Sequence, residues 1–187
     1  QTEFLIYVGD IKEMYTHLPH HVIIQAIKWV LGIIQSCTRR KEVSVHSWSY
    51  SYDDSFVCLS FQQIFDICLF DITNCFFMLS SVSFLQIFGI PMGSPGSPGY
   101  SMCICIFYEW KFRQSMFDYQ KLFGTARLMD DLRALVVYKK GCPTSQSIAS
   151  LLINLLASHC YHDSMVLIPE QVSNNTFQFL ESQITIT

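Results

Sequence analysis

The spacing of apolar residues along the chain predicts a succession of strands and helices. Alternation over residues 4–9 predicts a short strand with Asp10 at its end. Helical spacing predicts one helix opening at Pro19, one capped by Asp53 or Asp54 and running to residue 70, one starting at Ser97 or Gly99, and one over residues 145–159. Further strands are predicted at residues 75–79, 82–88, 121–128, 132–138 and within 176–187, whereas residues 41–52 favour a hairpin or an insertion.

The order of these elements predicts an α+β fold, in which helices pack on one face of an antiparallel sheet. The chain has 187 residues, of which half are hydrophobic and 14% are charged. This is enough for one sizeable core, so we expect a single domain over residues 1–187. Fifteen phenylalanines and a positive mean hydropathy also predict an apolar surface that is covered by a protein or RNA partner or by further segments of chain.

The charge of the chain is unusual for a protein that handles nucleic acid. The net charge is −3, and Lys and Arg supply most of the non-specific affinity for phosphates, so we expect weak nucleic-acid binding by this chain alone. The basic runs at residues 39–41 and 139–140 favour solvated turns. Eight cysteines without a C-x-x-C pair predict small buried hydrophobes in a reducing intracellular compartment, with mitochondrion and nucleus as candidates.

Neither a membrane span nor a zinc site is expected. The longest apolar stretch, residues 56–79, is interrupted by polar and acidic side chains, which argues against a membrane-spanning helix. The interpretation of the chain as a membrane-associated protein rests on its hydropathy alone. His17, His20 and His21 lie together, and His159 and His162 are three apart, but neither group has an acidic or cysteine partner at ligand spacing. A loop or a helix start explains them.

The stretch from Gly89 to Gly99, GIPMGSPGSPG, predicts a shaped loop. Its four glycines permit backbone conformations that a Cβ would forbid, and its three prolines fix φ and remove donors. A helix follows directly, so the loop can hold a phosphate or the backbone of a nucleotide at the helix N-terminus. The alternative is a plain glycine-rich turn between a strand and a core helix.

Four short motifs occur in order along the chain. The first has Asp10 at a strand end and Tyr15 five residues later, and the third has the pair Asp130 and Asp131 between two predicted strands. The second has the form Q-x-x-G-x-x-x-G-S-P-x-S-P, supplied by Gln86, Gly89, Gly93, Ser94, Pro95, Ser97 and Pro98. The fourth is FQFLESQI, with Phe179, Leu180 and Glu181. This series resembles the palm of reverse transcriptases, and DIKEMYTHLP, Asn74-Cys75-Phe76 and YEWKF are most similar to Penelope-like, telomerase-related members.

The resemblance implies an RNA-directed DNA polymerase palm that adds deoxynucleotides to a primer 3′ end by a two-metal mechanism. It implies that two Mg²⁺ ions, or Mn²⁺ in their place, are bridged by Asp10 and Asp130, with Asp131 in support and the Ile11 carbonyl as a further ligand. It implies that Tyr15 lies under the nucleotide sugar and rejects a 2′-hydroxyl. Residues along the template base and the incoming nucleotide would be Gln86, Gly89, Gly93, Ser94 and Pro95. The partners implied are an RNA template, a DNA primer and deoxynucleoside triphosphates, and we expect the fingers and thumb to be largely absent from the chain.

Departures from the family pattern keep a second function open. Leu128 stands where Tyr or Phe is usual, and Gly96 replaces a larger apolar residue. Arg133 follows the Asp pair closely and could contact primer phosphate or form an ion pair with Asp130. The alternative is a catalytically inactive, reverse-transcriptase-like subunit that has a structural or RNA-binding role in a larger ribonucleoprotein assembly, for which the mitochondrion is a candidate location.

Overall fold

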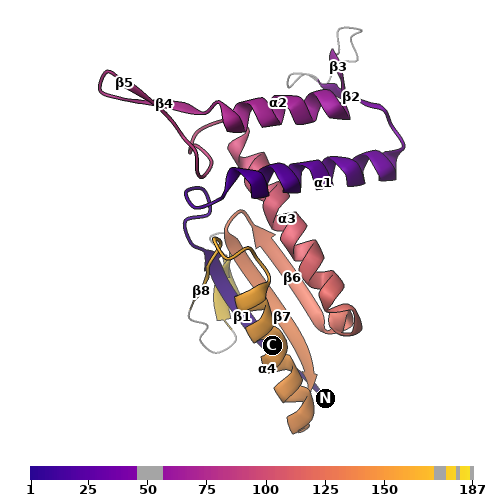
Figure 1. Cartoon of the computed structure of the whole chain (residues 1–187). Helices are drawn as coiled ribbons and strands as arrows, with labels where there is room; N and C mark the ends of the chain where they lie inside the picture. Colours follow the sequence, from indigo (N-terminus) through magenta and orange to yellow (C-terminus); the bar gives the residue numbers. More distant parts are fainter. Residues whose placement is uncertain (46–56, 171–175, 180–181, 186–187) are drawn as a thin grey trace. The chain divides into compact units, whose positions relative to one another are not determined.

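The computed structural model describes residues 1–45, 57–170, 176–179 and 182–185 (Figure 1). The chain divides into two compact units, residues 1–17 with 108–187 and residues 18–107. We call the first the sheet unit and the second the hairpin unit, and each is described by itself. The single domain expected from the sequence stays a prediction.

The sheet unit is built on a four-stranded antiparallel sheet in the order β6-β7-β1-β8. Its elements are β1 (Thr2–Ile11), η1 (Phe117–Leu122), β6 (Phe123–Leu128), β7 (Asp131–Lys139), α4 (Pro143–His159), β8 (Leu167–Pro169), and a separate pair β9 (Thr176–Phe179) and β10 (Ser182–Thr185). The pair β9–β10 confirms the strands predicted within 176–187, although Leu180 and Glu181 of the fourth motif lie outside the described residues. The short strand β8 was not predicted.

One face of this sheet carries the hydrophobic core. Val136 of β7 packs against Ala149 and Leu152 of α4, and all three are at most 1% exposed. Helix α3 (Ser97–Ser115) reaches the same face through Phe112, whose ring meets that of Phe123 edge-on at a centroid distance of 6.0 Å. We call this the helix face, and Figure 1 shows α4 running along the strands β1 and β7. The predicted α+β fold with an antiparallel sheet is confirmed.

The opposite face is defined by strand alternation. Asp10 lies across from Asp131, Val8 across from Arg133, and Ile6 across from Leu135. These residues alternate with Val136 and its neighbours, so they point away from the helix face. We call this the carboxylate face.

The described residues of the hairpin unit form helices and two pairs of short antiparallel strands. Its elements are α1 (His20–Thr38), β2 (Glu42–Val45), β3 (Val57–Ser60), α2 (Phe61–Thr73), β4 (Phe76–Leu79), β5 (Val82–Leu85) and residues 97–107 of α3. Helix α1 begins after Pro19, as predicted, and buries Val22, Ile23, Ala26 and Ile27. Among the described residues α1 alone is long and apolar enough to cross a membrane, but core helices meet the same two criteria.

The helix predicted from Asp53 or Asp54 begins later than expected. Residues 57–60 form β3, paired with β2, and α2 begins at Phe61. Its cap is Ser60, whose hydroxyl accepts the Gln63 N–H at 3.1 Å while the Gln63 side chain accepts the Ser60 N–H at 2.8 Å. Such a capping box satisfies two helix donors that would otherwise be unpaired. The predicted cap was therefore wrong, and Asp53 and Asp54 lie outside the described residues.

The β4–β5 hairpin presents an exposed apolar surface. The β4–β5 hairpin confirms the hairpin expected at residues 75–88, and its large apolar side chains are 42–69% exposed, from Phe76 to Leu85. An exposed patch of this kind was expected from the composition.

The cysteines were expected to be buried, but Cys37 and Cys58 are exposed and only Cys105 and Cys160 are fully buried. A thiol tolerates water, so an apolar sequence context does not fix its burial.

Candidate active site

The sheet brings the three predicted catalytic carboxylates to one end of the sheet unit. Asp10 is the last but one residue of β1 and lies opposite Asp131, the first residue of β7. Asp130 lies with Met129 in the turn between β6 and β7, where Met129 has a positive φ of 53°. The N–H of Ile11 donates to the carbonyl of Asp130 at 3.0 Å, which fastens the end of β1 to this turn.

The backbone of Ile11 also faces this turn. In an extended strand the N–H and C=O of one residue point to the same neighbouring strand. Because the Ile11 N–H donates to Asp130, its carbonyl oxygen is directed to the same side as the Asp pair. The structure thus places Asp10, Ile11, Asp130 and Asp131 together.

The carboxylates of the site lie close enough together to repel one another electrostatically. Burial raises the pKa of Asp10, and the charges of Asp130, Asp131 and Glu170 raise it further, while the Ile11 N–H acts in the opposite direction. Like charges that lie close together disfavour the ionised form, and a bound cation would relieve that repulsion. We call Asp10, Asp130, Asp131 and Glu170 the carboxylate cluster.

Glu170 is a member of this cluster that the sequence did not reveal. It directly follows β8, and its N–H donates to the carbonyl of Val8 at 2.8 Å. The strand β8 has three residues, LIP, which carry too little periodicity to predict a strand. An isolated acidic residue after a proline gave no signal of its own.

Arg133 is the buried cation beside the cluster. It is 8% exposed, and its Nη2 atom lies 3.6 Å from Oδ1 of Asp131 and 3.5 Å from Oε2 of Glu170. Its Nη1 donates to the carbonyl of Leu132 at 3.1 Å. An ion pair between Arg133 and Asp130 was one of the two possibilities considered from the sequence. In the structure Arg133 forms ion pairs with Asp131 and Glu170. Contact with a primer phosphate stays a prediction.

The donor set suits a hard divalent cation. Carboxylate and carbonyl oxygens are what Mg²⁺ prefers, and the mutual repulsion at Asp10 favours a positive ion. Within the described part of the chain, however, no group of three or more His, Cys, Asp or Glu side chains is arranged so that it could hold a metal ion. In the described residues, therefore, no three of the carboxylates converge on one point, and the finding does not concern an ion held by two of them.

Tyr15 lies in the sheet unit, in the segment that follows β1. It is half-buried, next to Thr16, whose N–H donates to the carbonyl of Glu13 at 3.0 Å. Glu13 has a positive φ of 51°, so the chain turns sharply here. The structure therefore places Tyr15 just beyond the strand that carries Asp10, and its contact with a nucleotide sugar stays a prediction.

The glycine-proline loop lies in the hairpin unit and has the shape expected of it. Gly89 and Gly93 have positive φ values of 74° and 97°, which side chains rarely adopt. The Gly89 N–H donates to the carbonyl of Leu18 at 2.8 Å, and the Ser94 N–H donates to that of Pro91 at 3.2 Å. The predicted need for glycine is therefore confirmed at two positions.

The start of α3 holds this loop in place. The buried hydroxyl of Ser97 donates to the carbonyl of Pro91 at 2.6 Å, and the helix begins at Ser97 as predicted. Upstream, the side-chain amide of Gln86 donates to the carbonyl of Phe88 at 2.8 Å, so Gln86 supports the loop entrance. Pro95 is exposed. The roles of the hairpin-unit residues toward template and nucleotide remain predictions.

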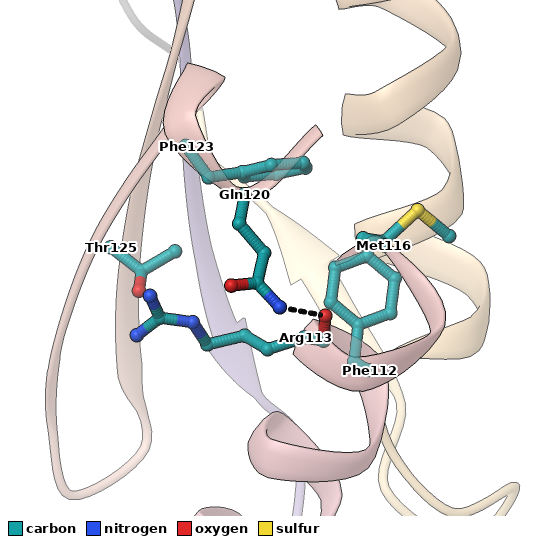
Figure 2. Close-up of a pocket in the computed structure, with 6 residues that line it drawn as sticks. All are labelled: Phe112, Arg113, Met116, Gln120, Phe123 and Thr125. Carbon is teal, nitrogen blue, oxygen red and sulfur yellow. Dashed lines mark hydrogen bonds between the residues drawn. The ribbon is translucent and has the colours of Figure 1, made fainter. Parts of the chain in front are cut away.

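A small pocket elsewhere in the sheet unit contains none of the predicted site residues. Figure 2 shows its lining, which consists of Phe112, Arg113, Met116, Gln120, Phe123 and Thr125. Its volume is about 100 Å³, and the amide of Gln120 donates to the carbonyl of Arg113 at 2.8 Å across it. The pocket opens between the end of α3, η1 and β6, on the helix face. It is therefore separate from the carboxylate cluster on the other face of the sheet.

Comparison with solved structures identifies the fold. No protein-family model and no curated protein sequence matches the chain. Telomerase from Candida albicans, in complex with a TWJ fragment of telomeric RNA, is similar with a TM-score of 0.61 and 13% identity, over 98% of this chain and 30% of that one. Apo telomerase from Candida tropicalis, truncated from its C-terminal domain, is similar with a TM-score of 0.58 and 15% identity, over 98% of this chain and 34% of that one.

These similarities define the class of fold and nothing narrower. At 13–15% identity they show a reverse-transcriptase-like fold, in agreement with the family that the motifs resemble. The chain spans about a third of the length of the telomerase chains that it matches. Activity, substrates and partners of the whole protein are therefore matters for proposal.

Proposed function

We propose that the chain is the palm of an RNA-directed DNA polymerase that adds deoxynucleotides to a primer 3′ end. The observation that supports this most strongly is the meeting of Asp10 with Asp130 and Asp131 at one end of a reverse-transcriptase-like sheet. Nucleotide addition requires negative charge at this point to hold divalent ions. The raised pKa of Asp10, caused by burial and by its acidic neighbours, is the electrostatic sign of such a site.

The residues of the cluster would have distinct roles. Asp10 and Asp130 would be the principal ligands of two Mg²⁺ ions, or of Mn²⁺, with Asp131 in support and the Ile11 carbonyl as an additional oxygen. The bound ions would supply Lewis-acid stabilisation of the charge that develops on the phosphate during transfer. The chain itself contributes the fixed register of β1 and β7, which keeps the carboxylates at one place.

The remaining motif residues would position the substrates. Tyr15 would lie against the sugar and exclude a 2′-hydroxyl by steric conflict. Gln86, Gly89, Gly93, Ser94 and Pro95 would form the floor under the template base and the incoming nucleotide, since the positive φ angles of the two glycines allow a close backbone approach. An RNA template is consistent with the RNA-bound telomerase that shares this fold. The motifs favour a Penelope-like, telomerase-related polymerase.

Primer extension by the complete protein tests the proposal. The Asp130→Asn variant should lower the rate of nucleotide addition by at least about 100-fold, because it removes a charged oxygen ligand without a change of shape. The matched control is Asp118→Asn, which neutralises an exposed carboxylate of η1, outside the cluster, and should stay within about twofold of wild type. Equal extension by wild type and Asp130→Asn would show that the catalytic assignment is wrong.

A second function is favoured by the pairing of Arg133 with Asp131 and by the exposed β4–β5 hairpin. Under this hypothesis the chain is an inactive reverse-transcriptase-like subunit with a structural or RNA-binding role in a larger ribonucleoprotein. Its presence at fixed stoichiometry in such an assembly, with unchanged assembly and RNA binding in Asp130→Asn, would support this function. Primer extension that wild type carries out and Asp130→Asn does not would exclude this second function.

A further inference from the structure

Arg133 and Glu170 form a polar row across three strands of the sheet, directly beside the row that contains Asp10. Val8 of β1 lies opposite Arg133 of β7. On the other side of β1, Glu170 donates its N–H to the Val8 carbonyl and so continues the β1–β8 register by one residue. The ion pair between Arg133 and Glu170, at 3.5 Å, therefore bridges β1 over Val8.

The neighbouring row holds the acidic residues. Asp10 lies between Asp131 of β7 and Ile168 of β8. Rows two residues apart on one face are separated by roughly 7 Å, which the side chains of Arg133 and Asp131 can span. The 3.6 Å distance from Arg133 Nη2 to Asp131 Oδ1 shows that Asp131 leans toward the arginine row.

The burial of Arg133 makes this arrangement durable. Its side chain is 9% exposed, while Asp131 and Glu170 are 38% and 46% exposed. A buried guanidinium that lost its partners would carry a large desolvation cost, so Arg133 retains them. The two carboxylates are partly solvated, whereas the guanidinium is almost entirely removed from water and held within the sheet, so the arginine determines where the carboxylates stay.

We propose that Arg133 is a positioning residue that withdraws Asp131 from metal binding, so that Asp10 and Asp130 are the pair of carboxylates to which the divalent ion binds. This inference rests on the proposed function and refines it. The buried guanidinium of Arg133 holds the carboxylate of Asp131 in place. Arg133 is itself held by Glu170, the residue that directly follows β8. The same positive charge moderates the affinity of the remaining pair for a divalent ion.

A double-mutant cycle on Mn²⁺ binding by the complete protein tests this role without an activity measurement. Free Mn²⁺ is measured by electron paramagnetic resonance, in wild type and in Asp10→Asn, Asp130→Asn, Asp131→Asn, Arg133→Gln and Asp131→Asn/Arg133→Gln. Asp130→Asn should weaken binding at least about tenfold, whereas Asp131→Asn should weaken it clearly less than Asp130→Asn does, because a nearby charge is lost but no ligand. Arg133→Gln should tighten binding about threefold to tenfold, since it removes a positive charge and frees Asp131.

The decisive comparison is the effect of Asp131→Asn in the two backgrounds. In the Arg133→Gln background the freed Asp131 becomes a ligand, so its neutralisation should weaken Mn²⁺ binding at least about tenfold. The conservative variant Arg133→Lys, which keeps the charge, should retain the wild-type pattern. Lys140→Gln is the matched control, because it removes the cation that pairs with Glu3 at 2.7 Å at the far end of β1, and it should leave Mn²⁺ affinity unchanged.

The outcomes separate the inference from the proposed function. If Asp131→Asn weakens Mn²⁺ binding in the wild-type background as much as Asp130→Asn does, the role of Arg133 is overturned while the metal site stands. That arm does not depend on the folding of any arginine variant. If neither Asp10→Asn nor Asp130→Asn changes Mn²⁺ binding, the metal site fails, and both the proposed function and this inference fail with it.

Discussion

Neutralisation of Asp10 should make the protein more stable at neutral pH. Asp10 faces Asp131 directly across the strands, and its pKa is raised by burial first and then by Asp130, Asp131 and Glu170. A site that holds like charges together stores repulsion, which the folded state must offset elsewhere. The variant Asp10→Asn keeps the size of the side chain and removes its share of that repulsion.

The size of the effect follows from the geometry. Like charges directly opposite one another in a sheet cost up to about 1 kcal/mol, and more distant charges on a half-exposed surface cost less because water screens them. Arg133 offsets part of the charge of Asp131 and Glu170. We therefore expect Asp10→Asn to raise the free energy of unfolding by about 1 kcal/mol, which corresponds to about 2–4 °C in Tm for a chain of this size.

The pH dependence has a definite sign. The folded protein keeps the Asp10 proton to a higher pH than the unfolded chain, where the ordinary value of 3.8 applies. Between these two pKa values the folded state binds more protons, so wild-type stability falls as pH rises through the window and the cost persists above it. The advantage of Asp10→Asn should therefore be full at pH 7 and disappear as the pH approaches the unfolded pKa.

Urea unfolding at a series of pH values, monitored by circular dichroism, measures this difference. Asp118→Asn is the control and should shift the free energy of unfolding by at most about 0.5 kcal/mol. Millimolar Mg²⁺ should raise the stability of wild type more than that of Asp10→Asn, because only the intact cluster gains from a cation. The reasoning is refuted if Asp10→Asn is no more stable than wild type at pH 7, or if its advantage is the same at low pH.

Two further substitutions test the local structure around the motifs. Ser97→Ala removes the 2.6 Å hydrogen bond from a buried hydroxyl to the Pro91 carbonyl, and should lower the free energy of unfolding by about 1–2 kcal/mol in urea titrations. No loss would mean that this bond does not hold the loop. Met129→Gly relieves a positive φ of 53° in the turn that carries Asp130, and should raise thermal stability by about 0.5–1 kcal/mol. A lower Tm would show that packing of the methionine outweighs the strain.

The parts of the site that could be predicted are those encoded in short stretches of sequence. Alternation places Asp10 at a strand end, and β1 extends from Thr2 to Ile11 around the predicted segment. The Asp pair was expected between two strands, and it lies at the turn between β6 and β7, with Asp131 already paired in β7. Glycine and proline fix the loop before α3 because their backbone preferences are local.

The parts that could not be predicted depend on contacts between distant segments. Glu170 joins the cluster only because β8 pairs with β1, and three residues give no period from which to predict that strand. Arg133 lies 37 positions from Glu170, so only the folded register identifies them as partners. The start of α2 was misplaced because β3 pairs with β2, and this pairing overrides the helical spacing of apolar residues that begins at Val57.

The β4–β5 hairpin has a practical consequence through its lack of charge. No Asp, Glu, Lys or Arg occurs between residues 72 and 108, a stretch that includes this hairpin, the glycine-proline loop and the start of α3. Without charges there is no electrostatic steering, so any association through the hairpin forms at the slow rates typical of neutral surfaces. Salt weakens nucleic-acid binding by counterion release but leaves an apolar contact intact. A salt titration therefore separates association of the protein through this hairpin from its binding to nucleic acid.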